Sequence, residues 1–187
     1  ERTAFFILRA ARLSETERVM IESGTLARVL GVPKLPPAPE PEGFAALKKR
    51  PKFDNHWHTS GWNIIEPRID FASISRELDD YNIRLAVTSS IRALNDDIAA
   101  GNAETAEFLK CESRARGLIV INPLEPESSI AEIEKYRTHP GFVGIKTIQD
   151  FYRLRLDYPG YRRILDHARR HPDLPLMAHL PGMAEIA

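Results

Sequence analysis

Five short apolar stretches, separated by segments of helical periodicity, constrain the fold of this 187-residue chain more than any other feature. The second to fourth are apolar nearly throughout, which is typical of strands buried on both faces of a parallel sheet. Apolar residues recur at helical spacing between them. We therefore predict an α/β fold with five parallel strands joined by helical crossovers. The predicted strands are residues 52–58, 84–88, 118–122, 142–148 and 174–179, and the predicted helices lie near 71–81, 95–116, 126–136 and 161–168.

The first predicted strand carries two histidines two residues apart. Side chains alternate along a strand, so Asp54, His56 and His58 project from the same face. Two imidazoles fill a core poorly, because each buried ring nitrogen needs a partner. Neutral imidazole is instead a good ligand for zinc, iron or nickel. The alternative is a pair of partly exposed histidines at a strand end.

Two architectures fit the strand and helix pattern. One is a TIM-type (β/α)8 barrel, of which this chain holds the first five strands, and the other is an open five-stranded flavodoxin-like sheet. Both gather functional groups at the carboxyl ends of their strands, where His58 and His179 lie. The first and fifth strands face each other across the lumen only in a barrel, so a metal shared by these histidines favours the barrel.

The composition limits the classes of binding partner and the cellular compartment that we expect. Lys plus Arg and Asp plus Glu both number 26, so nothing indicates a nucleic-acid or anionic-membrane surface. A lone cysteine, Cys111, excludes an internal disulfide and fits a reducing compartment. The apolar run at residues 4–8 is too short to span a bilayer. We expect a cytoplasmic protein with a small-molecule partner, and a homo-oligomer is compatible with the sequence.

Three motifs follow one another in the chain: Asp54-x-His56-x-His58, the run 141–146 (Gly-Phe-Val-Gly-Ile-Lys) and the run 174–179, which ends in His179. Together they resemble the amidohydrolase superfamily, and most of all its aminocarboxymuconate-semialdehyde-decarboxylase-like branch. The resemblance implies that His56, His58 and His179 bind a divalent metal, for which we expect zinc. It further implies a metal-dependent hydrolase or non-oxidative decarboxylase acting on a small carboxylated or cyclic substrate. The alternative is a non-catalytic amidohydrolase-like domain that serves assembly or ligand binding.

Lys146 is the candidate catalytic residue outside the metal ligands. Some members of the superfamily carry a carboxylated lysine on this strand that bridges two metals, whereas the decarboxylase-like branch generally uses one metal. We favour a contact from Lys146 to a substrate carboxylate or an internal acid. Asp54 is expected to be a carboxylate that orients its neighbours.

The resemblance also suggests how the chain is organised. Residues 1–32 resemble the helical C-terminal end of an amidohydrolase barrel, residues 33–50 form a proline-rich linker, and residues 51–187 resemble the first half of a barrel. The family's catalytic aspartate lies on a later strand than those found here. We expect an excerpt of a longer chain, a tandem unit or a permutant; the alternative is an N-terminal helical extension docked on its own barrel.

Two further histidines, His167 and His171, lie four residues apart, a spacing compatible with metal binding. Arg169 and Arg170 lie between them, and no acid occupies the usual neighbouring position. We therefore predict a solvated helix flank here.

Overall fold

The structure is a computed structural model, and it describes residues 43–59, 70–95 and 97–179. The chain divides into two compact units, Glu1–Leu47 and Lys48–Ala187. The predicted N-terminal segment 1–32 lies outside the described residues, so its resemblance to the end of a barrel stays a prediction. A short helix, α4 (Phe44–Lys49), forms within the last part of the predicted linker.

The second unit alternates strands and helices as predicted. Its strands are β1 (Lys52–His58), β2 (Ile83–Ser89), β3 (Ala115–Val120), β4 (Phe142–Ile148) and β5 (Leu176–His179). Its helices are α5 (Phe71–Asp80), α6 (Ile91–Asn95), α7 (Ile98–Cys111), α8 (Pro126–Tyr136), α9 (Gln149–Tyr152) and α10 (Pro159–Ala168).

All five strands join one parallel sheet in the order β1-β2-β3-β4-β5. A flavodoxin-like sheet has the order 2-1-3-4-5, so that alternative is wrong. Sequential neighbours in order are the arrangement of a TIM barrel, in which each crossover adds the next strand on the same side. The described strands therefore form the first five strands of a barrel, as predicted.

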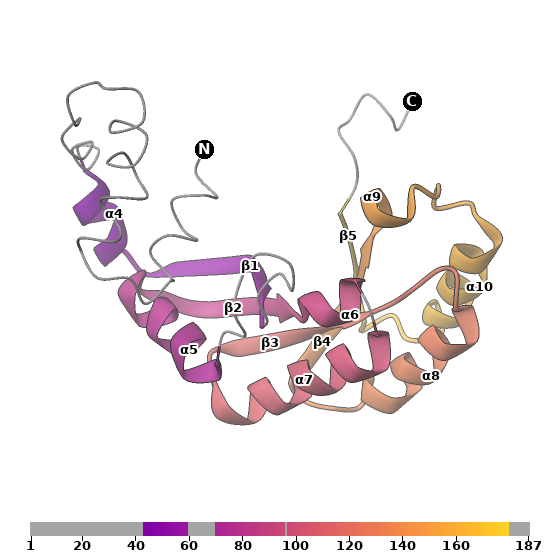
Figure 1. Cartoon of the computed structure of the whole chain (residues 1–187), viewed down its shortest axis with the longest axis horizontal. Helices are drawn as coiled ribbons and strands as arrows, with labels where there is room; N and C mark the ends of the chain where they lie inside the picture. Colours follow the sequence, from indigo (N-terminus) through magenta and orange to yellow (C-terminus); the bar gives the residue numbers. More distant parts are fainter. Residues whose placement is uncertain (1–42, 60–69, 96, 180–187) are drawn as a thin grey trace, which may run out of the picture. The chain divides into compact units, whose positions relative to one another are not determined.

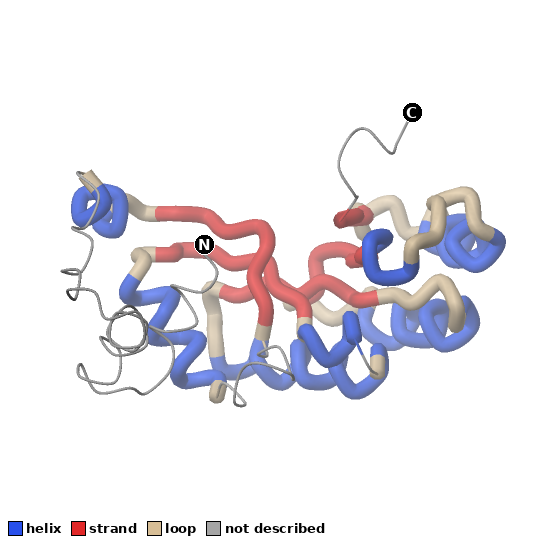
Figure 2. Tube along the Cα trace, turned by 45° about the horizontal axis from the view of Figure 1, so that its top comes forward, coloured by secondary structure: helices blue, strands red, loops and turns tan. Residues whose placement is uncertain are grey.

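The sheet is covered on one face and curls towards the other. Helices α5, α7 and α8 lie on the same face of the strands (Figures 1 and 2). Strand β5 runs at a steep angle to β1 (Figure 1). In a flat sheet four spacings of about 4.8 Å would separate the first and fifth strands by about 19 Å. The ring centroids of His56 on β1 and His179 on β5 are nevertheless 5.3 Å apart. The curl thus brings the carboxyl ends of the two outer strands together.

The main core lies between β3 and β4 and the helices that cover them. Ile119, Ile145, Ile133 and Ile164 are at most 1% exposed and belong to one apolar cluster with Tyr161. The Tyr161 hydroxyl is satisfied inside this core by the Thr147 hydroxyl, at 2.8 Å. Because β3 and β4 are buried along nearly their whole length, most of their residues are apolar rather than alternating with polar ones.

Asn102 of α7 ties that helix to the end of β3. Its side chain is fully buried, donates to the Val120 carbonyl and to Glu132 Oε2 (both 3.1 Å), and accepts from the Val120 amide at 2.9 Å. The helix is positioned by its own cap, since Asp97 accepts a hydrogen bond from the Ala100 amide. None of the described helices is long and apolar enough to cross a membrane.

Substituting Asn102→Ala should destabilise the chain strongly. The change leaves both backbone groups of Val120 and the carboxylate of Glu132 without this partner, and a buried polar group that loses its partner costs about 1–3 kcal/mol. We expect the free energy of unfolding to fall by about 2–4 kcal/mol in urea titrations. The matched control is the exposed Asn95→Ala, expected within about 0.5 kcal/mol of the parent; equal effects of the two changes would contradict the role given to Asn102.

Candidate functional site: a histidine cluster at the carboxyl ends of the strands

Three histidines from the two outer strands meet at the carboxyl edge of the sheet. His56 and His58 lie at the end of β1 and His179 ends β5. The ring centroid of His56 is 5.3 Å from that of His58 and 5.3 Å from that of His179. The structure therefore brings together the three residues that the sequence predicted as metal ligands, and we call them the histidine cluster.

Lys146 of β4 contacts the same cluster through its buried side chain. Its side chain is 1% exposed, and its Nζ is 3.1 Å from His56 Nε2 and 3.5 Å from Met177 Sδ. Burial lowers the pKa of the Lys146 ammonium below its usual range. The contacts of Lys146 in the structure are thus to a metal-ligand candidate and a thioether rather than to an internal acid, and its predicted contact with a substrate carboxylate stays a prediction.

A backbone carbonyl fixes the tautomer of His58. His58 Nδ1 is 3.1 Å from the Ser89 carbonyl oxygen, which can only accept, so Nδ1 carries the proton and Nε2 keeps its lone pair. Burial lowers the pKa of His58 to about 4, and nearby His56 and Lys146 add to the shift. Burial also lowers the pKa of His56, with Lys146 as the next cause. Both imidazoles are consequently neutral at pH 7, the form that binds a metal.

Ser89 was not among the residues predicted for the site. The sequence does contain an indication, because Thr88, Ser89 and Ser90 form a polar run at the carboxyl end of β2. Asp54 behaves as predicted towards its neighbours: its Oδ1 accepts a hydrogen bond from the His56 amide at 2.9 Å. The Ser89 carbonyl thus orients the ring of His58, and the Asp54 carboxylate holds the backbone amide of His56.

The side chains of the histidine cluster are of a kind that binds a divalent ion. Their donor atoms lie farther apart than those of side chains that already surround one ion. In the described part of the chain, three donor atoms of His, Cys, Asp or Glu lie within 4.8 Å of one another at Glu134, His167 and His171. The donor atoms of the histidine cluster are farther apart than that, and the Lys146 ammonium is the close neighbour of His56 Nε2. Two neutral imidazoles, one of fixed tautomer, and a third beside them are the chemistry that zinc and related ions select.

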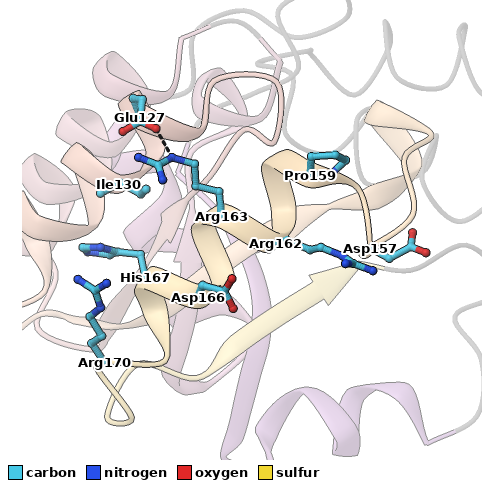
Figure 3. A pocket seen from close by; sticks show the side chains of 9 residues that line it. All are labelled: Glu127, Ile130, Asp157, Pro159, Arg162, Arg163, Asp166, His167 and Arg170. Atoms are coloured by element: carbon cyan, nitrogen blue, oxygen red, sulfur yellow. Dashed lines mark hydrogen bonds and ion pairs between the residues drawn. The ribbon is translucent and has the colours of Figure 1, made fainter.

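A hollow of about 620 Å³ lies elsewhere, along α8 and α10 (Figure 3). Its walls are charged: they carry the acids Glu127, Asp157 and Asp166 and the arginines Arg162, Arg163 and Arg170, and Glu127 pairs with Arg163. No member of the histidine cluster lines it. The chemistry of the cluster, not the volume of this hollow, therefore identifies the candidate site.

Comparison with known proteins supports the fold. No family model and no curated protein matches the chain. Among solved structures it is similar to 5-carboxyvanillate decarboxylase from Novosphingobium aromaticivorans, solved with manganese and 4-hydroxy-3-methoxy-5-nitrobenzoic acid. That match has 18% identity and a TM-score of 0.51, and covers 68% of this chain and 49% of the decarboxylase. A candidate amidohydrolase from Staphylococcus aureus matches at 19% identity and a TM-score of 0.50, covering 73% of this chain and 49% of that protein.

These similarities confirm the predicted fold. The described strands are arranged like the corresponding strands of those proteins, and the chain spans about half the length of the proteins it matches. The decarboxylase binds a divalent metal, manganese, and a small carboxylated aromatic compound. The metal in this decarboxylase is manganese and not the zinc that we expected for this chain.

The pKa of His58 predicts how the metal-free chain responds to acid. A folded-state pKa of about 4 against 6.5 means that the unfolded chain binds more protons below pH 6.5, so stability falls as pH falls. Between pH 7 and 5 this group should remove about 2 kcal/mol from the free energy of unfolding. His58→Asn keeps an N–H for the Ser89 carbonyl, and its side chain does not titrate. With a chelator present, the free energy of unfolding of this variant should therefore fall by about 2 kcal/mol less than that of the parent between pH 7 and 5. Parallel losses in the two proteins would refute the assignment.

Proposed function

We propose that the chain is part of a metal-dependent enzyme of the amidohydrolase type, a hydrolase or non-oxidative decarboxylase that acts on a small carboxylated or cyclic substrate. One observation carries this proposal: β1, β4 and β5 of a barrel-ordered sheet bring His56, His58, His179 and the buried Lys146 together at their carboxyl ends. Active sites of TIM-barrel enzymes lie at that end of the barrel.

The three histidines would hold the ion in this proposal. When bound, a divalent ion supplies Lewis-acid polarisation of the substrate and favours activation of water. The Ser89 carbonyl holds the proton of His58 on Nδ1, which presents Nε2 as the ligand atom. Imidazole ligands favour zinc, whereas the similar decarboxylase was solved with manganese. We propose zinc as the ion to test first, with manganese as the competitor.

Lys146 would bind the carboxylate of the substrate. A buried ammonium is unfavourable without a negative partner, and the described contacts of Lys146 Nζ are an imidazole nitrogen and a thioether sulfur. A substrate carboxylate at this position would restore the charged form of the lysine and would be held beside the histidine cluster. This chemistry supports the proposal of a carboxylated substrate that contacts Lys146.

Metal analysis of the purified full-length protein tests the ligand set. His56→Ala should remove one ion per chain, because an imidazole that contributes to the cluster is lost. The control is His139→Ala, which removes an imidazole from the turn before β4, where its Nδ1 accepts from the Gly141 amide; it should leave the metal content unchanged. A His56→Ala protein with the metal content and stability of the parent would favour the non-catalytic alternative.

A second experiment tests Lys146. Lys146→Met keeps an unbranched apolar stem in the core, so the protein should fold and keep its metal. Turnover of small aromatic carboxylates, with 5-carboxyvanillate as the first probe, should fall at least about 100-fold, as expected when a charge-stabilising group is removed. The exposed Lys110→Met serves as the control and should retain the parent's turnover. Equal rates for parent and Lys146→Met would exclude the proposed role of this lysine.

A further inference from the structure

A second cluster of metal-compatible side chains lies on the helical layer, away from the histidine cluster. Glu134 of α8 accepts hydrogen bonds on Oε1 from His167 Nε2 at 2.8 Å and from His171 Nε2 at 3.1 Å. The side chains of His167 and His171 are 17% and 19% exposed. The prediction of a solvated helix flank is therefore wrong: both imidazoles are half-buried and share a carboxylate.

From this geometry we propose that Glu134, His167 and His171 form a binding site for a divalent cation of the zinc type, separate from the proposed catalytic centre. The potential donor atoms of the three side chains lie within 4.8 Å of one another. Two imidazole nitrogens and one carboxylate oxygen are a ligand set that zinc accepts, with the remaining position open to water. Binding would replace the two hydrogens that now point at Glu134.

The backbone that carries these ligands is anchored by core packing and by hydrogen bonds. The neighbour of Glu134, Ile133, is fully buried, and so is Ile164 of α10, which packs in the same core. The chain after α10 is held in a tight turn, because the amides of Arg170 and His171 donate to the carbonyls of His167 and Ala168 at 3.1 and 2.8 Å. A site whose ligands are already positioned loses little conformational entropy when the ion binds.

The charges around the site favour its carboxylate form and moderate its affinity. Arg137 donates from Nε to Glu134 Oε2 at 2.7 Å, and this contact, with those of the two histidines, lowers the pKa of Glu134 to about 2. Glu134 is therefore ionised at neutral pH, with Oε1 directed at the imidazoles. Arg170 lies close to His167 on the wall of the hollow, so two cations neighbour the site (Figure 3). Because these cations repel a divalent ion, we expect reversible rather than permanent binding.

The bound ion would join two segments that are distant in the sequence. It would connect α8 to the turn after α10, and the same turn leads into β5, since the Leu174 amide donates to the His171 carbonyl at 3.0 Å. Leu174 is itself buried in the main core. An ion at Glu134 would thus stabilise the approach to β5, the strand that ends in His179, without contacting the histidine cluster.

Zinc binding by matched variants tests the proposal. The protein, purified without a polyhistidine tag and stripped with chelator, is titrated with zinc in competition with a chromophoric chelator. Glu134→Gln should weaken one zinc site at least about 10-fold, since even changes outside the ligand shell cost that much. The control is Glu127→Gln: Glu127 also lies on α8 and also pairs with a residue of α10, Arg163 (Figure 3), but contacts neither histidine. It should leave both the number and the affinity of the zinc sites unchanged.

Two further measurements keep the result unambiguous. The double variant His167→Ala/His171→Ala should lose the same zinc site as Glu134→Gln, whereas His56→Ala should retain it. Zinc in excess should raise the Tm of His56→Ala by several degrees, and that rise should vanish when Glu134→Gln is added. Equal zinc numbers and affinities for Glu134→Gln and Glu127→Gln, or a Tm rise that survives the second substitution, would overturn the proposal.

Discussion

The curl of the parallel sheet is the constraint on which the candidate site depends. Strands β1 and β5 are the outer strands of the described sheet, yet the rings of His56 and His179 are 5.3 Å apart. A close backbone approach helps to make this possible. A Cβ at Gly144 of β4 would lie 2.6 Å from the Pro175 carbonyl, the group that accepts from the Ile145 amide where β5 joins the sheet. A larger residue at Gly144 would push β5 away and open the cluster.

The fold was largely predictable because burial and sequence pattern coincide. Strands β1 and β4 have the predicted bounds, since β4 is apolar where it is buried and β1 begins after Pro51. Strand β3 begins three residues earlier than predicted. The apolar run continues to Ile121, but the residues that pair with β2 are Ala115, Arg116 and Gly117. Hydrogen bonding, not hydrophobicity, sets where that strand starts. The long predicted helix 95–116 is shorter and begins at Ile98, because Asp97 caps it.

The candidate sites were predictable to different degrees for the same kind of reason. Two histidines at alternate positions of one strand are visible as a local pattern, and the resemblance to the amidohydrolase superfamily then pointed to His179. Glu134, by contrast, is separated from His167 and His171 by 33 and 37 residues and approaches them only because α8 and α10 pack together. No spacing rule along α10 contains that information. A contact between helices decides the chemistry there, and it becomes visible only in three dimensions.

The two clusters differ in the charge that they bring to an ion, and this difference supports the separate roles that we propose for them. At the histidine cluster, burial lowers the pKa values of His56, His58 and Lys146, so the surroundings oppose positive charge. An ion held there by neutral imidazoles keeps its full charge, and a carboxylated substrate is the natural group to offset it. At Glu134 the protein supplies its own carboxylate, with a pKa lowered to about 2. That cluster can compensate part of the charge of an ion without a substrate, which suits the stabilising site that we propose. The histidine cluster has no such carboxylate ligand, which suits the proposed site that must bind an anion before it reacts.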